Sequence, residues 1–144
     1  MIIRKMTIED IPELTDLYKQ FWGEESNIEK MVKKFSELQK SDTHILLSAI
    51  EENHLIGTVT GIVCEELYGD CRPFLVVEDM IVDKSNRKQG VGKALFSELE
   101  KLAKNKNCTQ IILVTETERT DACGFYEAMG FHPTANRGYK KKLY

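Results

Sequence analysis

The sequence has no long apolar run, no metal-binding pattern and no excess of basic charge. Arg4 and Lys5 interrupt its opening apolar residues, and no later run approaches the roughly 18 apolar residues of a membrane span. Its 4 cysteines include no C-x-x-C pair and its 3 histidines are not spaced like zinc ligands, so we expect no metal site. Its 20 basic residues against 23 acidic ones give a formal charge of −3, which argues against a nucleic-acid or membrane partner.

The remaining totals favour one compact domain. A chain of 144 residues with 42% hydrophobic content can bury one sizeable core, and a second independent core is not expected. We therefore predict a single domain over residues 1–144. Because no secretory or membrane-spanning pattern is found, we also predict a cytoplasmic protein with reduced thiols.

The first part of the chain predicts a short strand followed by two helices. Residues 2–3 open the strand. Asp10 with Glu13 forms a capping-box pattern for the first helix, which Gly23 is expected to end. Ser26, with a glutamate three residues on, repeats this capping pattern for the second helix.

The middle of the chain changes to the two-residue period of strands. Apolar and β-branched residues over 45–50 and 55–63 flank a polar turn and predict a hairpin, in which Gly57 and Gly61 are expected to mark bulges. The run Phe74–Val82 is almost wholly apolar, which is typical of a strand covered on both faces.

The last part of the chain alternates helices and strands. Gly90 precedes an amphipathic helix, residues 111–114 predict a short buried strand, and residues 121–129 predict another helix. Residues 138–143 predict a final edge strand. This order of elements predicts a mixed α/β (α+β) layer fold.

The strongest chemical signal is the loop between the strand Phe74–Val82 and the helix after Gly90. The first turn of a helix has backbone N–H groups without internal partners, and the helix dipole favours an anion there. A P-loop pattern fails, because Arg87 stands where its first glycine is needed and Ala94 follows the Gly-Lys pair. A dinucleotide fingerprint fails at Leu95. The loop therefore predicts a phosphate site of another type.

Two motifs in this sequence resemble those of the GNAT (GCN5-related N-acetyltransferase) superfamily. The first is R-x-x-G-x-G, read here as Arg87-Lys88-Gln89-Gly90-Val91-Gly92. The second is A-x-x-F-Y-E-x-x-G-F, over residues 122–131. The motifs stand in the family's order, and the resemblance covers nearly the whole chain. It implies a single-domain fold with a mixed central sheet of about six or seven strands flanked by about four helices.

The resemblance also implies how the chain binds acetyl-CoA. The backbone of the strand before the loop is expected to hydrogen-bond the pantetheine arm, and the loop amides are expected to bind the pyrophosphate. The amide of Met80 is expected to point at the thioester oxygen. Arg119 stands where many family members have Asn, and it could reach a phosphate. The implied cofactor-binding residues are Met80, Ile81, Val82, Arg87, Lys88, Gln89, Gly90, Val91, Gly92 and Arg119.

Acetyl transfer to an amine needs a proton donor for the departing thiolate and a base for the amine. The resemblance implies Tyr126 as the donor. Glu78 is the candidate base, because apolar surroundings disfavour a charged carboxylate and prepare it to take a proton. Asp79, which points to the opposite face of a regular strand, and water stay open as alternatives.

We therefore predict an acetyl-CoA-dependent N-acetyltransferase that moves acetyl directly to a primary amine in a ternary complex. Aromatic and acidic residues such as Trp22, Glu24 and Tyr68 favour a small cationic amine as the partner. One alternative is acetylation of a protein N-terminus or lysine. An alternative of another class is a non-catalytic acyl-CoA-binding module. The family often dimerises, which leaves a homodimer open.

Overall fold

The computed structural model describes all 144 residues, which group into two compact units, Met1–Ile112 and Leu113–Tyr144. The helices and strands of the first unit are β1 (Ile2–Lys5), η1 (Ile8–Asp10), α1 (Ile11–Trp22), α2 (Ile28–Leu38), β2 (His44–Glu51), β3 (His54–Cys64), β4 (Phe74–Val82), η2 (Lys84–Asn86), α3 (Val91–Asn105) and β5 (Ile111–Ile112). The second unit contains α4 (Thr120–Ala128).

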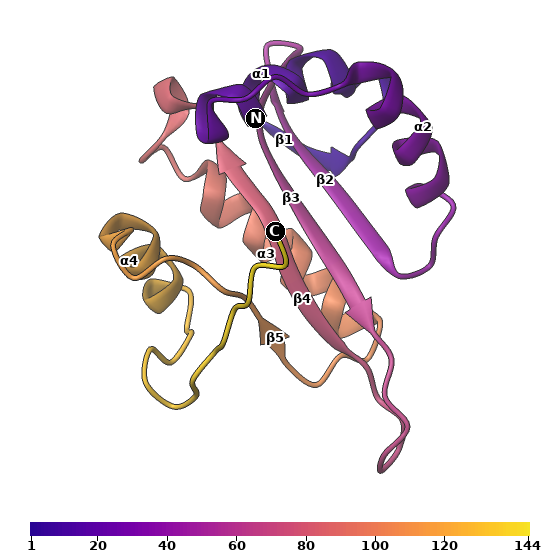
Figure 1. Cartoon of the computed structure of the whole chain (residues 1–144), viewed down its shortest axis with the longest axis vertical. Helices are drawn as coiled ribbons and strands as arrows, with labels where there is room; N and C mark the ends of the chain where they lie inside the picture. Colours follow the sequence, from indigo (N-terminus) through magenta and orange to yellow (C-terminus); the bar gives the residue numbers. More distant parts are fainter. The chain divides into compact units, whose positions relative to one another are not determined.

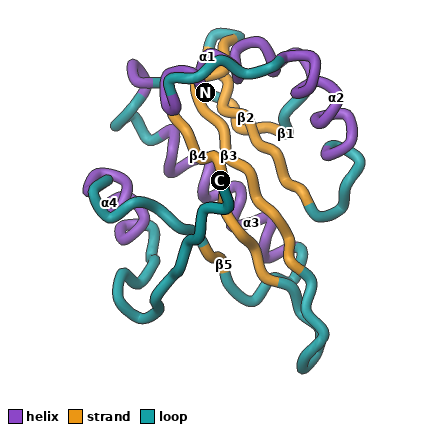
Figure 2. The backbone as a smooth tube through the Cα atoms, in the orientation of Figure 1, coloured by secondary structure: helices purple, strands orange, loops and turns teal.

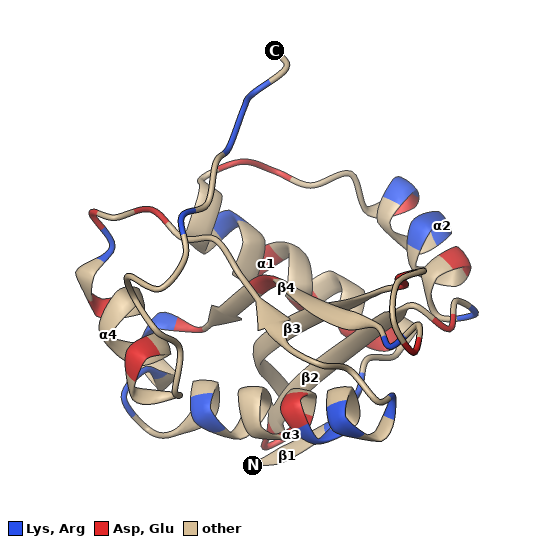
Figure 3. Cartoon of the chain, turned by 90° about the horizontal axis from the view of Figure 1, so that it is seen from below, with Lys and Arg blue, Asp and Glu red and all other residues tan.

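The first unit is a mixed sheet with helices on both faces. Its strand order is β1-β2-β3-β4-β5, with antiparallel neighbours except for the parallel pair β4 and β5. Helix α3 packs against β2, β3 and β4 on one face, and α1 packs against β3 and β4 on the other (Figure 1, Figure 3). The predicted α/β class with four helices is confirmed. The prediction of one domain stays a prediction.

The sheet has five strands, fewer than the six or seven expected. The missing strand is the one predicted over residues 138–143, where the chain after α4 runs as loop (Figure 2). Three consecutive lysines, Lys140–Lys142, put like charges in a row, and lysines at a sheet edge oppose pairing. The predicted helix over 121–129 is confirmed to within one residue at each end, and Gly130 follows it with φ 96°.

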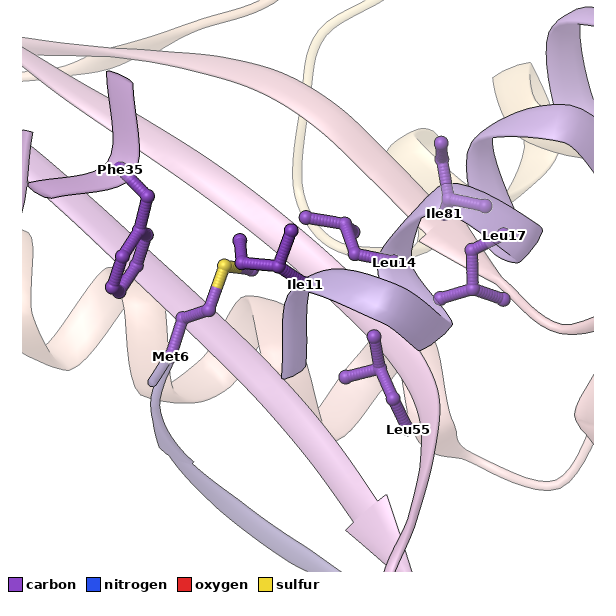
Figure 4. Close-up of a cluster of buried hydrophobic side chains, with 7 residues drawn as sticks. All are labelled: Met6, Ile11, Leu14, Leu17, Phe35, Leu55 and Ile81. Atoms are coloured by element: carbon purple, nitrogen blue, oxygen red, sulfur yellow. The ribbon is translucent and has the colours of Figure 1, made fainter. Parts of the chain in front are cut away.

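Apolar side chains from several elements form a core between α1, α2 and the sheet (Figure 4). Each of these side chains, when fully buried, stabilises the fold by about 1.5–3 kcal/mol. This core fixes α1 over the end of β4 that precedes the phosphate-loop candidate. Its members are Met6, Ile11, Leu14, Leu17, Phe35, Leu55 and Ile81.

Two glycines let α3 approach the sheet closely. A Cβ on Gly61 would stand 2.6 Å from Cδ1 of Leu99, and one on Gly57 would stand 3.1 Å from side-chain atoms of Leu95 and Val91. The prediction that Gly61 marks a bulge is wrong, since it pairs regularly with both neighbouring strands. Beside Gly57 a bulge does occur, where the pairing of β2 with β3 shifts register.

The predicted capping box of α1 is wrong, because Asp10, the N-cap residue, makes no side-chain cap bond there; the capping box lies one turn earlier, between Thr7 and Asp10 at η1. Asp10 accepts two hydrogen bonds of 2.7 Å from the Arg4 guanidinium, one of 3.0 Å from the Thr7 amide and one of 2.8 Å from the Ser48 hydroxyl. Glu13 instead accepts the amide of Leu55 on β3. These carboxylates therefore tie the helical layer to the sheet.

The N-terminus of α2 also differs from the prediction by one residue. The capping side chain is Asn27, whose Oδ1 accepts the Lys30 amide at 2.9 Å. Ser26 precedes it. The end of α1 at Gly23, with φ 77°, is confirmed.

Candidate active site

One edge of β4 is paired along only part of its length. On the side of β5, the register contains two pairs, Leu75 with Ile111 and Val76 with Ile112. Beyond Val76 no strand pairs with this edge of β4, whereas β3 follows β4 along its other edge up to Val82. The second half of β4 thus presents backbone N–H and C=O groups of the kind that an extended ligand can bind as an added strand.

A bulge interrupts β4 within this half. Thr60 of β3 pairs with Glu78 and Thr58 pairs with Ile81, so Asp79 and Met80 together oppose Val59. Asp79 adopts φ 50°, in the left-handed region that a residue with a Cβ enters at a cost of about 1–2 kcal/mol. Strain of this kind is often found at functional sites, where the surrounding fold maintains it.

The bulge decides which carboxylate of β4 is shielded from water. Asp79 is half-buried, and burial raises the pKa of its carboxyl. Glu78 is exposed, so the expectation that it lies in apolar surroundings is wrong. The alternation of side chains in a regular strand places Glu78 and Asp79 on opposite faces. It could not show which of the two is shielded from water, because the shielding of Asp79 depends on the bulge and on α1.

Tyr18 of α1 interacts electrostatically with the charge of Asp79. Burial and this charge together raise the pKa of Tyr18, so its phenol stays neutral at ordinary pH. Its ring meets Trp22 edge-on with centroids 5.1 Å apart, and Trp22 meets Phe21 at 5.0 Å. Trp22 is half-exposed. An aromatic cluster therefore continues from Tyr18 to the surface of α1.

The loop after β4 turns through two left-handed residues before α3 begins. Lys88 has φ 61° and Gly90, the N-cap of α3, has φ 84° with no side-chain cap. No backbone amide from Arg87 through Lys93 makes a hydrogen bond of ordinary geometry to a protein acceptor, and the first amide of this region to do so is that of Ala94, which bonds the Gly90 carbonyl at 3.0 Å. The amides of the R-x-x-G-x-G loop are therefore available to a ligand.

Side-chain hydrogen bonds hold the loop in shape, together with backbone bonds at its start from Asp83 to Ile56 and from Asn86 to Asp83. Asp83 caps η2 by accepting the amide of Ser85 at 2.9 Å, and it also accepts the hydroxyl of Ser85 and Nε2 of Gln20, the latter at 2.6 Å. Hydrogen bonds from Ser85 and Gln20 lower the pKa of Asp83. Further on, Nε of Arg87 donates to the Val82 carbonyl at 3.2 Å and Nε2 of Gln89 donates to the Ser85 carbonyl at 2.9 Å.

Sequence reasoning missed this support. The capping signal of Asp83 and Ser85 was present locally, but Gln20 lies 63 residues away and no local pattern connects it to the loop. Its side chain joins α1 to the start of the loop, since its Oε1 also accepts the Lys84 amide at 3.3 Å.

Tyr126 and Arg119 belong to the second unit. Tyr126 is half-buried on α4, with its ring edge-on to Phe125 at 5.3 Å and to Phe131 at 5.8 Å. Arg119 is the N-cap residue of α4, and its guanidinium lies 4.0 Å from the Glu116 carboxylate. The roles predicted for both residues stay predictions.

Two further properties concern the whole chain. No group of three or more His, Cys, Asp or Glu side chains is arranged to hold a metal ion. None of the helices combines the length and apolar character that crossing a membrane requires.

Comparison with known proteins places the chain in one family. The uncharacterized protein YdhI of Bacillus subtilis is 27% identical over 119 residues, which are 82% of this chain and 66% of YdhI. A putative acetyltransferase from Agrobacterium tumefaciens shares the fold with a TM-score of 0.91, 21% identity and 99% coverage of both chains. The aminoglycoside N-acetyltransferase AAC(6')-Iy, solved in complex with CoA, has a TM-score of 0.82 and 23% identity, covering 99% of this chain and 94% of its own. The family model for the acetyltransferase (GNAT) family matches residues 11–131, and the chain belongs to that family.

Proposed function

We propose that this chain, as a single domain over residues 1–144, transfers an acetyl group from acetyl-CoA to a primary amine of a small cationic molecule. The observation that carries the proposal is the set of unbonded amides from Arg87 through Gly92, at the positively polarised N-terminus of α3. A diphosphate supplies the acceptor oxygens that these donors lack. A cytoplasmic location and a homodimer stay predictions.

The loop suits a diphosphate because Gly90, at the N-terminus of α3, has no side chain to keep a phosphate away from the backbone. The left-handed φ of 84° at position 90 favours glycine, and no protein atom lies within 4 Å of the place where a Cβ on Gly90 would stand. The exposed side chains of Arg87, Lys88 and Lys93 add positive charge around the same turn. Together these features favour an anion held by the main chain.

The unpaired edge of β4 suits the pantetheine arm. The amide groups of the arm can form hydrogen bonds with the backbone of Met80, Ile81 and Val82, as a further strand would. This edge lies beside the loop that is proposed to hold the pyrophosphate. The bulge at Asp79 turns the Met80 amide out of the regular ladder, and this donor is proposed to stabilise the oxyanion that forms when the amine attacks.

The proposed base is Asp79, acting directly or through water, and Glu78 is the second candidate. A raised pKa suits a carboxylate that must take a proton from an ammonium group, and only Asp79 of the two is sheltered from solvent. The same carboxylate and the Trp22 ring can attract a cationic acceptor. The acceptor of AAC(6')-Iy, an aminoglycoside by its name, is an amine of this class.

The proposed proton donor for the departing thiolate is Tyr126, and Arg119 is a proposed phosphate contact. Both assignments come from the family resemblance. A Tyr126→Phe variant tests the first of them, because loss of a donor should lower turnover about 10²-fold or more while leaving coenzyme affinity intact.

The testing experiment is a panel of amines incubated with acetyl-CoA while free thiol release is followed. Polyamines, amino sugars, aminoglycosides and an N-terminal peptide cover the small-amine proposal and the protein-acetylation alternative. Thiol release that depends on one class of amine identifies the acceptor. If coenzyme A binds but no amine releases thiol, the chain is a binding module and the transfer proposal is wrong.

Coenzyme binding has its own matched pair of variants. Gly90 and Gly69 are both left-handed, with φ 84° and 59°, and a Cβ on either would meet no protein atom within 4 Å. Gly90→Leu and Gly69→Leu therefore impose similar backbone strain. Calorimetry should show weaker coenzyme A binding for Gly90→Leu alone, and equal affinities would contradict the loop assignment.

A further inference from the structure

A cleft lies at the opposite end of α3 from the R-x-x-G-x-G loop. Its volume is about 260 Å³, equal to roughly nine water molecules, so it suits a ligand smaller than a drug. We call it the α2–α3 cleft, since the ends of both helices border it. It is lined by Lys5, Met6, Phe35, Gln39, Lys40, Ser41, Asp42, His44, Ile45, Leu46, Leu102 and Lys106.

The α2–α3 cleft is far from the candidate active site. Helix α3 has 15 residues and is therefore roughly 22 Å long. The amides of the loop after β4 stand at its N-terminus, while Leu102 and Lys106 border the cleft at its C-terminal end. A ligand in the cleft cannot also contact those amides unless it spans the length of the helix.

Five of the lining residues are apolar, and they come from both faces of the sheet at the edge of β2. Met6 and Phe35 are buried members of the core, Ile45 is buried on the α3 face of the sheet, and Leu46 and Leu102 are half-buried. They come from the segment after β1, from α2, from β2 and from α3. Such a lining can exchange water for the hydrocarbon part of a ligand.

Three lysines from separate segments line the same cleft without a carboxylate partner. Lys5 and Lys40 make no ion pair, and Nζ of Lys106 donates to the backbone carbonyl of Asp42 at 3.0 Å. Elsewhere on the helices, lysines such as Lys104 pair with glutamates. In a chain with net charge −3, the convergence of three ammonium groups without ion pairs is a local excess of positive charge.

The polar groups between the lysines add both donors and acceptors. The hydroxyl of Ser41 lies 2.8 Å from that of Thr43, which in turn lies 3.1 Å from Nδ1 of His44. Asp42 is the one acidic residue of the lining; its backbone carbonyl accepts Lys106, and its carboxylate offsets one of the three positive charges. Three ammonium groups against one carboxylate leave the lining with an excess of positive charge, which favours a ligand that carries negative charge.

We propose that the α2–α3 cleft binds a small amphipathic carboxylate, with its hydrocarbon chain against the apolar lining at the edge of β2 and its carboxylate among Lys5, Lys40 and Lys106. The charge and the apolar surface are both needed, because exposed lysines alone attract anions only weakly. Nothing in this proposal depends on acetyl transfer or on the loop after β4.

The test is a titration of the ¹⁵N-labelled full chain with sodium octanoate, followed by NMR. Saturable shifts are expected at amides of residues 39–46 and 102–106 that persist when coenzyme A is present. The neutral analogue 1-octanol should give much weaker shifts. A Lys40→Ala, Lys106→Ala double variant should bind octanoate at least about fivefold more weakly.

The matched control is Lys104→Ala, which removes a lysine of α3 that is paired with Glu100 and lies outside the cleft. It should bind octanoate as the unaltered chain does. Shifts that fall at residues 87–93, equal binding of octanol and octanoate, or equal affinities of the double variant and the control would each overturn the proposal. All the lysines involved are exposed, so the variants are expected to fold, and an unchanged spectrum without ligand verifies this.

Discussion

Two regions of the first unit remove a carboxylate from water, with opposite results. At the junction of β1, η1 and β2, the side chain of Asp10 is 6% exposed and accepts four hydrogen bonds, two of them from Arg4. Burial alone would raise the pKa of Asp10, but the hydrogen bonds from Arg4, Thr7 and Ser48 outweigh it, and the pKa is lowered. At the bulge of β4, burial acts on Asp79 without such donors and the pKa is raised.

This contrast separates a structural carboxylate from one suited to chemistry. A carboxylate whose charge is fully satisfied holds segments together and has little tendency to take a proton. A sheltered carboxylate without donors is a poor contributor to stability, but it is ready to accept a proton. The fold maintains the second arrangement with a left-handed residue, at a cost in backbone strain.

The largest effect is expected on removing the structural carboxylate. Asp10→Ala should lower the free energy of unfolding by about 3 kcal/mol, because it leaves the Arg4 guanidinium, the Thr7 amide and the Ser48 hydroxyl without their acceptor. Denaturant unfolding measures the loss. Asp16→Ala, which removes an exposed carboxylate of α1, is the control and should leave stability nearly unchanged. Equal losses would show that the four hydrogen bonds contribute little.

The next effect concerns turnover rather than stability. Asp79→Asn keeps the shape of the side chain but cannot take a proton, so it should lower the rate of thiol release about 10²-fold with coenzyme affinity unchanged. Its stability at neutral pH should rise slightly, since a sheltered charge without donors is removed. Glu78→Gln is the matched control on the exposed side of β4. A greater loss in Glu78→Gln would assign the base to Glu78.

Much of the fold follows from local pattern. The strand Phe74–Val82 has the predicted bounds and the next helix begins after Gly90 as predicted, because an apolar run between polar segments and a glycine before a 3.6-residue repeat are local signals. The β2–β3 turn at Glu52 and Asn53, both with positive φ, is equally local. The expected last strand over residues 138–143 does not form, since short apolar stretches among lysines become strands only where a neighbour pairs with them.

The candidate site was predictable in its loop but not in its carboxylate. The R-x-x-G-x-G segment can be read from the sequence, and its amides are unbonded in the structure. The shelter of Asp79 arises because β3 pairs with β4 out of register at Val59 and because Tyr18 of α1 stands nearby. Both causes depend on tertiary structure, and neither can be recognised in the residues next to Asp79 in the sequence.

A smaller effect is expected on the pH dependence of stability, with opposite signs for the two carboxylates. The lowered pKa of Asp10 gives stability that is present above its ordinary value of 3.8 and lost as pH falls through the lower folded value. Because the pKa of Asp79 is raised, the folded chain binds more protons than the unfolded chain at pH values just above 3.8. The contribution of Asp79 to stability therefore falls as pH rises through that window. Urea unfolding from acid to neutral pH should show this as a difference, because the stability of the unaltered chain relative to Asp79→Asn should decrease as pH rises through that window.

The proposed difference between Asp79 and Asp10 would be contradicted if the stability of Asp79→Asn had the same pH profile as that of the unaltered chain. That result would mean that Asp79 has donors in solution and resembles Asp10. Asp10→Asn provides the opposite case, because its deficit relative to the unaltered chain should be largest at neutral pH and should shrink in acid.

The smallest effect is expected at Tyr18, where it tests whether the Asp79 charge reaches α1. Burial is the main reason that the pKa of Tyr18 lies above its ordinary value of 10.0, and the Asp79 charge is the lesser one. Asp79→Asn should therefore lower the pKa of Tyr18 slightly while leaving it raised. NMR of ¹³C-labelled tyrosine rings measures this, with Tyr18→Phe to assign the signal and Glu78→Gln as the charge control. If the Tyr18 signal responds equally to both charge variants, or to neither, the Asp79 carboxylate does not lie near α1. The burial that makes Asp79 the proposed base would then have to come from the sheet alone.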